Sequence, residues 1–262
     1  MGTTTFSTAL RQGVSVVCTL LLLAFPPGAF IMAQSTGAPT PEPAPPSGPA
    51  LTPDQLDTLV APIALYPDAL LSQVLVASTY PLEVVEASQW LQQNRGLSGQ
   101  QLVDAARSQN WDPSVQALVV FPDVIGRLNA DIRWTTDLGN AFLAQQADVM
   151  NAVQRMRQQA MAAGHLSSNS RETVTTQTDN GQSAIVIQPA DPQVIYVPEY
   201  NPMYVWGPPA WGYYPAWYYP DYGWGFGFDT GIFLGGFFGG LGWGGWGWGP
   251  NWFNCSVFLN GG

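Results

Sequence analysis

Two short motifs place an aspartate directly after an aromatic residue and a proline: Tyr66-Pro67-Asp68 and Phe121-Pro122-Asp123. A pair of carboxylates can perform general acid–base catalysis, for example in the cleavage of glycosidic bonds. The alternative is structural, because proline suits the first turn of a helix and the helix dipole stabilises an aspartate there. We favour the structural interpretation, since similar residues begin other predicted helices. We expect Asn at either position to change stability by no more than about 1 kcal/mol.

Few other side chains in the sequence could carry catalysis or bind a metal. His165 is the only histidine, and Cys255 is the only cysteine after residue 33. An ordinary zinc site needs several such ligands, and a Ser-His-Asp triad would have to use His165, which lies in an apparent linker. No phosphate-binding loop, dinucleotide fingerprint or Asp-x-Asp-x-Asp calcium loop is present. We therefore predict no catalytic residue, no metal site, no cofactor and no enzymatic activity.

The segment 206–262 differs sharply from the rest of the chain. Between Trp206 and Trp252 it carries eight of the eleven tryptophans and fifteen glycines. Because so many glycines cost backbone entropy and supply no packing, we predict a disordered, low-complexity tail that displays its aromatic rings. Such rings can bind partner proteins or sugar faces without charge. The candidate binding residues are Trp211, Tyr213, Tyr214, Trp217, Tyr218, Tyr219 and Trp224.

The tail has two alternative interpretations. One is a spacer without any binding role, as many low-complexity segments are. The other is membrane insertion and oligomerisation, because residues 230–249 carry no charge and contain glycines at four-residue spacing, which allows helices to pack closely in lipid. Ten of those twenty residues are glycine, however, and this disfavours a helix.

The charge balance limits the partners of the chain. It carries a formal net charge of −10, with 18 acidic and 8 basic residues and no lysine. Nucleic acid needs clustered positive charge to neutralise its phosphates, so we expect no nucleic-acid partner. The partners that stay open are an envelope protein, a glycan, a membrane surface or a second copy of the chain, each reached through the tail.

The N-terminus has the pattern of a secretory signal peptide. Arg11 is followed by the apolar run Val14 to Phe25, which is too short to span a bilayer comfortably. We predict cleavage after Ala33, so that 1–33 is the signal peptide and the mature protein is exported to the periplasm, the cell envelope or the medium. An uncleaved anchor helix is the alternative. Residues 34–51 are rich in proline and predict an extended linker.

Residues 52–165 have the pattern of a helical domain. Apolar residues at helical spacing follow start signals at Thr52, Pro67, Pro81, Ser98, Asp112 and Pro122. Thr52 and Ser98 each have a glutamine three residues later, which predicts two capping boxes. The last helix is predicted from about Thr136 to Ala163, with Gly164 as its C-terminal cap. Its inward face comprises Leu138, Phe142, Val149, Val153 and Met156.

Residues 166–205 change to a β pattern. Segments 173–178, 184–188 and 194–197 are β-prone, and Asn180-Gly181 is a strong signal for a type I′ hairpin turn. We predict a three-stranded meander that docks on the helical domain, because a lone meander is marginally stable in water. The expected fold class is therefore α+β, mainly α. It comprises six to seven helices, a small antiparallel meander and the disordered tail 206–262.

Several of these motifs together resemble a bacterial family catalogued as domain of unknown function 3300. The resemblance rests on the run Leu59-Val-Ala-Pro-Ile-Ala-Leu-Tyr-Pro-Asp-Ala-Leu-Leu and on Ile187-Gln-Pro-Ala-Asp-Pro-Gln-Val-Ile-Tyr-Val-Pro. It covers residues 52–206. Family members resemble exported proteins and often carry glycine- and aromatic-rich tails. The family has no established activity, so the resemblance assigns no functional residue.

These observations lead to one functional hypothesis and two alternatives. The hypothesis is an exported, non-enzymatic scaffold or binding protein of the cell envelope, whose aromatic tail mediates association. The first alternative is a cell-wall hydrolase that uses Asp68 and Asp123 as a carboxylate pair. The second is a tail that inserts into the membrane and oligomerises.

Overall fold

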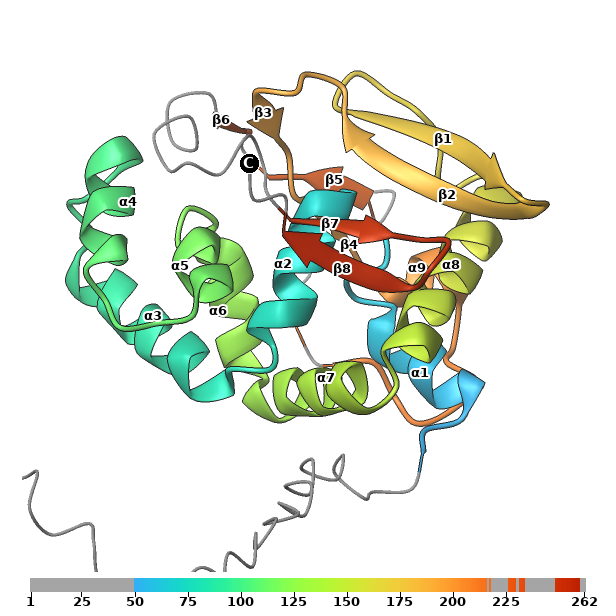
Figure 1. The fold of residues 1–262 in the computed structure, drawn as a ribbon, viewed down its shortest axis with the longest axis horizontal. Helices are drawn as coiled ribbons and strands as arrows, with labels where there is room; N and C mark the ends of the chain where they lie inside the picture. Colours follow the sequence, from blue (N-terminus) through green and yellow to red (C-terminus); the bar gives the residue numbers. More distant parts are fainter. Residues whose placement is uncertain (1–49, 216, 218–225, 230, 234–247, 260–262) are drawn as a thin grey trace, which may run out of the picture. The chain divides into compact units, whose positions relative to one another are not determined.

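The computed structural model describes residues 50–215, 217, 226–229, 231–233 and 248–259 (Figure 1). Helices dominate the first two thirds of the described chain, and short antiparallel strand pairs pack on them. The predicted fold class is confirmed at this level: mainly α, with small antiparallel strand pairs. In the part of the chain that the structure describes, no helix is long and apolar enough to span a membrane.

The first six helices begin at the predicted start signals. They are α1 (Pro53–Val60), α2 (Asp68–Ala77), α3 (Pro81–Gln93), α4 (Gly99–Arg107), α5 (Pro113–Leu118) and α6 (Pro122–Ala130). The capping box at Thr52 is formed, because the Thr52 side chain accepts from the Gln55 backbone and Gln55 accepts in return from the Thr52 backbone. The second predicted box is wrong, since the side chain of Ser98 makes no capping hydrogen bond to α4.

The long last helix of the prediction is two helices, α7 (Ile132–Ala144) and α8 (Gln146–Ala162). The break is at Gln145, whose φ of −141° and ψ of 47° are not helical. Its side chain accepts from the Leu51 backbone nitrogen at 2.7 Å and donates to the Leu51 carbonyl at 3.2 Å. A contact across the fold therefore accompanies the break, and no local glycine or proline could have revealed it. The cap at Gly164 is confirmed by its φ of +79°.

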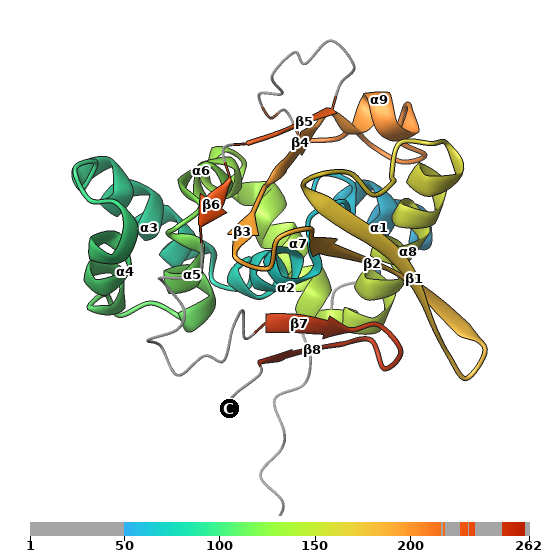
Figure 2. The same cartoon turned by 90° about the horizontal axis from the view of Figure 1, so that it is seen from above.

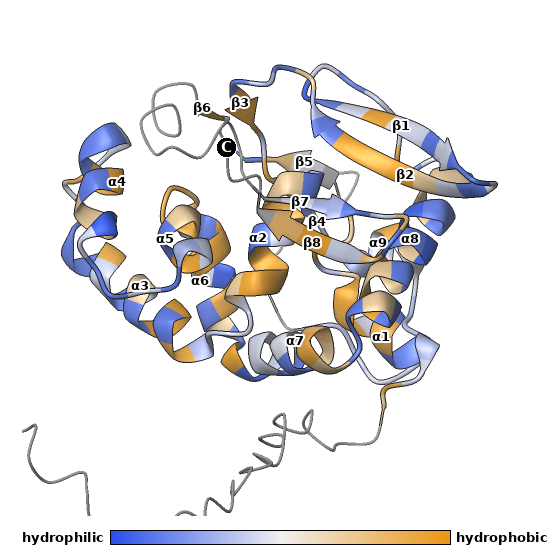
Figure 3. Cartoon of the chain, viewed as in Figure 1, coloured by the Kyte–Doolittle hydropathy of each residue, from blue (hydrophilic) through white to orange (hydrophobic). Residues whose placement is uncertain are grey.

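The hairpin is confirmed, but the third strand of the predicted meander is not part of it. Strands β1 (Glu172–Asp179) and β2 (Gln182–Pro189) pair around Asn180 and Gly181, whose φ values are both positive. Figure 3 shows the hydrophobic colouring along β2 and a largely hydrophilic β1, which agrees with the burial of residues 184–187. The remaining pairs are β3 (Val194–Ile195) with β6 (Ile232–Phe233) and β4 (Pro198–Tyr200) with β5 (Phe226–Phe228).

The described residues of the tail are folded, which corrects the prediction of a displayed, disordered segment for those residues. Besides β5 and β6, they form the hairpin of β7 (Trp248–Asn251) and β8 (Ser256–Leu259), and the short helix α9 (Pro202–Trp206) ends at the first residue of the tail. Figure 2 shows this hairpin beside α2, on which β7 packs. Trp217 and Trp252 are buried, so the tail contributes to the hydrophobic core. The described residues all belong to one compact unit, 44–262.

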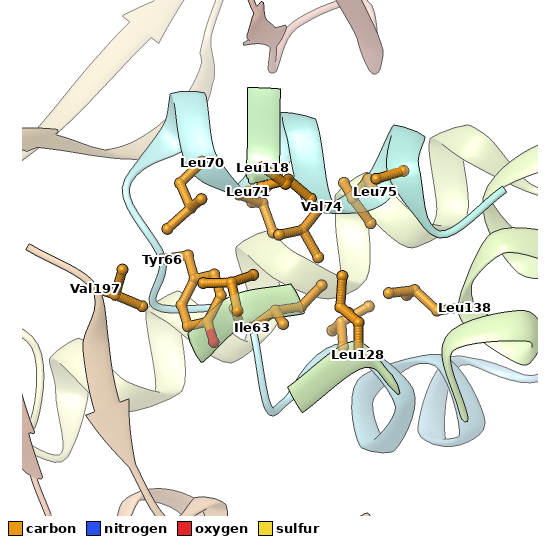
Figure 4. Packing of buried hydrophobic residues seen from close by; sticks show 14 of the residues in the cluster. Ile63, Tyr66, Leu70, Leu71, Val74, Leu75, Leu118, Leu128, Leu138 and Val197 are labelled. Atoms are coloured by element: carbon orange, nitrogen blue, oxygen red, sulfur yellow. The ribbon is translucent and has the colours of Figure 1, made fainter. Parts of the chain in front are cut away.

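The centre of the core is formed by α2 and by the loop that precedes it. The close view shows these side chains packed against one another (Figure 4). Fully buried residues labelled there are Ile63, Leu70, Leu71, Val74, Leu75, Leu118 and Leu138. Every residue of the loop 61–66 is buried as well. A buried loop must satisfy its backbone polar groups within the protein, because water does not reach them.

Arg157 of α8 donates hydrogen bonds to carbonyl groups of this loop, although its own side chain is fully buried. Its Nε donates to the Ala64 carbonyl at 2.8 Å and its Nη2 to the Tyr66 carbonyl at 2.9 Å. Its Nη1 donates to Asp68 Oδ1 at 2.6 Å and to the Ile185 carbonyl of β2 at 2.8 Å. The guanidinium thus joins α8, the buried loop, α2 and β2.

Asp68 completes this network and extends it to the tail. Its Oδ1 also accepts from the Ile187 backbone nitrogen at 3.3 Å, and its Oδ2 accepts from Trp252 Nε1 at 2.9 Å. The Trp252 ring lies over the Arg157 guanidinium, with 4.8 Å between the guanidinium carbon and the ring centroid. Asp68 is therefore the counter-ion of a buried arginine rather than only a helix-start residue, and the expected limit of about 1 kcal/mol no longer applies to it.

We predict that Asp68→Asn lowers the free energy of unfolding by about 3–5 kcal/mol, because it leaves a fully buried guanidinium without its counter-charge. The matched control is Asp57→Asn. Asp57 pairs with Arg155, two residues before Arg157, but those side chains are 19% and 37% exposed. The control should cost at most about 1 kcal/mol. Urea denaturation of both variants measures the difference, and equal losses would contradict the assignment.

A second prediction concerns the crossing of α7 over the end of α2. A Cβ on Gly139 would lie 2.1 Å from the Ser78 carbonyl oxygen, so the two backbones touch through this glycine. We predict that Gly139→Ala destabilises the fold by about 3 kcal/mol or more. Gly126→Ala on α6 is the control, because nothing lies within 4 Å of its added Cβ. Alanine there should stabilise the helix by up to about 1 kcal/mol, and thermal unfolding compares the two variants.

Candidate functional site

The main candidate site is a groove with a volume of about 820 Å³. Four segments surround it: residues Ala50 and Leu51, which precede α1, helix α1 itself, helix α7, and the tail residues from Trp211 to Pro215. A volume of this size falls within the usual range for small-molecule and cofactor pockets. We call it the aromatic groove, because Trp134, Trp211 and Tyr213 line it.

Hydrogen bonds between distant segments hold the walls of the aromatic groove together. Thr58 of α1 donates its hydroxyl to the Trp211 carbonyl at 3.0 Å, which fixes the tail against α1. Trp134 Nε1 donates to the Leu59 carbonyl at 3.1 Å, which ties α7 to α1. Gln145 holds the backbone of Leu51 at the end of α7. The groove is therefore built by the fold and does not depend on a single loop.

The aromatic rings of the groove differ in exposure. Trp211 is 56% exposed and Tyr213 is 86% exposed, which is unusual for side chains of this size. Trp134 is buried and meets Trp217 edge to face, with ring centroids 4.8 Å apart and an interplanar angle of 80°. The buried pair supports the groove from below, while Trp211 and Tyr213 offer ring surface to a ligand.

Helix α7 adds a polar ridge to the groove. Arg133, Asp137 and Asn140 are exposed, line the groove and follow helical spacing along α7. Within the described ranges, none of the three side chains forms a hydrogen bond or an ion pair. Among the described residues, one guanidinium, one carboxylate and one amide therefore have no protein partner, and together they carry no net charge.

The structure separates the candidate residues of the sequence analysis into four groups. Trp211 and Tyr213 line the groove, as the prediction of displayed rings requires. Tyr214 is half-buried, and burial followed by the negative charge of Asp57 raises the pKa of its phenol. Trp217 is a core residue, so its assignment to a binding surface is wrong. The remaining candidates, Tyr218, Tyr219 and Trp224, lie outside the described residues.

Sequence reasoning missed the contribution of α7 to the site. Trp134 was not distinguishable from an ordinary core residue, because its role depends on which ring packs beneath it. The spacing of Arg133, Asp137 and Asn140 was a usable signal, since residues four and seven apart share one helix face. Only the fold shows that this face meets Trp211 and Tyr213.

Asp68 and Asp123 each bind other groups in the fold. Both oxygens of Asp68 are engaged with Arg157, Ile187 and Trp252. Asp123 is hydrogen-bonded to Asp229, which directly follows β5. Burial and then the neighbouring Asp229 raise the pKa of Asp123, while the positive charge of Arg127 opposes the rise.

Arg127 balances part of this charge. It forms an ion pair with Glu199 of β4 and donates to the Tyr66 hydroxyl at 3.3 Å. The acidic side chains here are therefore partnered with a guanidinium rather than arranged around an open cation site. Over the described residues, no three His, Cys, Asp or Glu side chains are placed to hold a metal ion.

The fold is a helical domain that is completed by strands from an aromatic tail, and it contains the aromatic groove. The family model described as protein of unknown function (DUF3300) matches residues 52–257, and the chain belongs to this family. The chain is also 39% identical over 215 residues to the uncharacterized protein YacH of Escherichia coli (strain K12). The alignment covers 68% of this chain and 35% of that relative, so the chain spans about a third of the relative's length. No solved structure matches the chain significantly.

Glu172, at the start of β1, is a buried titratable group that the sequence analysis did not single out. It is 2% exposed, its Oε1 accepts from Asn169 at 3.1 Å, and its Oε2 has no hydrogen-bond partner among the described residues. Burial raises the pKa of Glu172 to about 7, although the hydrogen bond from Asn169 and the charge of Arg157 oppose the rise. The folded protein therefore holds a proton on this carboxyl more tightly than the unfolded chain does.

From this follows a loss of stability as the pH rises. A carboxyl whose pKa is higher in the folded state favours folding while it is protonated, so its contribution disappears between the ordinary value of 4.5 and about 7. We expect Glu172→Gln to remove up to about 3 kcal/mol of the pH dependence over that range. Denaturation at pH 5 and pH 8 measures it. Asp179→Asn, an exposed acid at the end of the same strand, should leave the dependence unchanged.

Proposed function

We propose that this chain is an exported, non-enzymatic binding protein of the bacterial cell envelope, and that the aromatic groove is its binding surface. The observation that carries the proposal is the exposure of Trp211 and Tyr213 at the edge of a built groove. Exposed aromatic surface beside unpaired polar groups is typical of interaction sites. The groove also uses the tail for binding, in agreement with the hypothesis from the sequence.

Two features of the sequence support export to the envelope. Arg11 and the apolar run Val14 to Phe25 have the form of a signal peptide, with cleavage expected after Ala33. The proline-rich segment 34–51 would then act as a spacer between the point of export and the folded unit.

The chemistry of the carboxylates favours binding over catalysis. The hydrolase alternative required Asp68 and Asp123 to act together, yet Asp68 compensates a buried arginine and Asp123 contacts Asp229. In the aromatic groove, Asp137 is an exposed carboxylate of α7. We therefore propose a scaffold and binding role.

The test is co-sedimentation of the full-length protein with an insoluble envelope fraction of Escherichia coli. The double variant Trp211→Ala/Tyr213→Ala should reduce the bound fraction by about tenfold, because it removes both exposed rings of the groove. The control is Tyr204→Ala on α9, since Tyr204 is 68% exposed and does not line the groove.

Circular dichroism should show unchanged helical content in all three proteins, because none of the substituted side chains is buried. An equal loss of binding in Tyr204→Ala would mean that exposed rings bind without specificity. Retention of binding in the double variant would contradict the groove as the site.

A further inference from the structure

We propose that the aromatic groove binds an uncharged polysaccharide chain. This inference rests on the proposed function and narrows it to one class of ligand. It combines two features that meet in the groove: the open rings of Trp211 and Tyr213, and the unpaired polar ridge of α7.

The rings match one part of a sugar. A pyranose has a face of C–H groups, which packs on an aromatic ring without any need for charge. Trp211 is 56% exposed and Tyr213 is 86% exposed, while Thr58 holds the Trp211 backbone in place. Both rings are thus accessible, and the backbone of Trp211 is fixed, which reduces the entropy lost on binding.

The ridge matches the other part of a sugar. Arg133 offers donors, Asp137 offers acceptors, and Asn140 offers both, so the ridge can pair with hydroxyl groups in either role. Arg133 and Asn140 are seven positions apart in the helix. This spacing corresponds to a rise of about 10 Å, which is longer than one sugar ring. The ridge therefore faces at least two successive units of a chain.

Charge excludes the main competing ligands. The ridge carries one guanidinium and one carboxylate, and Asp131 at the start of α7 adds another carboxylate to the groove lining. An anionic lipid or phosphate would meet this acidic lining and a chain of net charge −10. A purely apolar ligand would leave Arg133, Asp137 and Asn140 without partners beside it.

The experiment is titration of the full-length protein with two defined probes, cellotetraose and the β-1,4-linked tetramer of N-acetylglucosamine. Calorimetry should show saturable binding of at least one probe. Trp211→Ala should weaken it by about tenfold or more, and a tenfold change corresponds to about 1.4 kcal/mol. Asn140→Ala should also weaken it, because Asn140 is exposed and its loss removes a hydrogen-bonding group without disturbing the core. Tyr204→Ala should bind like the wild type.

A proline-rich decapeptide is the third probe, because aromatic-lined grooves also accept extended proline segments. Binding of the peptide but of neither saccharide would overturn the polysaccharide proposal and identify a peptide groove. Failure of both saccharides in a protein that still sediments with envelope through Trp211 and Tyr213 would overturn the ligand class and leave the proposed function standing. Loss of groove-dependent sedimentation would instead contradict the proposed function itself.

Discussion

The backbone polar groups of the buried loop 61–66 must find hydrogen-bond partners within the protein, and this requirement organises the surrounding elements. The residues of the loop are inaccessible to water, so its carbonyl groups need partners from the protein. Arg157 donates hydrogen bonds to two of these carbonyls. The Tyr200 hydroxyl donates to the Ala61 carbonyl and accepts from the Leu65 backbone nitrogen. Burying a guanidinium is costly unless it is fully hydrogen-bonded and neutralised, which is the role of Asp68. A single network thus brings α2, α8, β2 and β4 to the same loop.

This network also explains why the described part of the tail belongs to the fold. Trp252 donates to Asp68 and covers the Arg157 guanidinium, so the hairpin of β7 and β8 excludes water from the ion pair. Strands β5 and β6 supply the partners of β4 and β3, which would otherwise be short unpaired strands. Among the described residues of the tail, Trp217 and Trp252 lie in the core, whereas Trp211 and Tyr213 are exposed in the groove.

The aromatic groove depends on the same long-range contacts. The break at Gln145 ends α7 and holds Leu51, while Trp134 reaches from α7 to the carbonyl of Leu59. Close contact of Gly139 with Ser78 sets the approach of α7 to α2. The site is consequently a product of packed helices with a tail segment fixed across them. A ligand would meet a preformed surface, which favours affinity because little ordering remains to be done.

Several features of the fold arise from local chemistry and can be predicted from neighbouring residues. Prolines and caps placed the starts of α1 to α6, Asn180-Gly181 placed the hairpin, and Gly164 ended α8. Apolar spacing identified the inward residues Leu138, Val149 and Val153, which are all buried. These signals are readable because turn and helix geometry depend on neighbouring residues.

Features that join distant residues could not be predicted in this way and emerge only in the folded protein. It paired β3 and β4 with strands of the tail, and it turned Asp68 from a helix-start residue into the counter-ion of Arg157. Arg157 lies four residues after Val153 on the inward face of α8, and this spacing is consistent with burial. Its partners, however, are either 89 residues or more away in the chain or belong to strand β2. From its composition alone, the glycine-rich aromatic tail is predicted to be disordered. The described residues of the tail nevertheless pack on the fold, because a buried charge and unpaired strand edges both require cover. Trp252 covers the charge, and β5 and β6 pair with the strand edges.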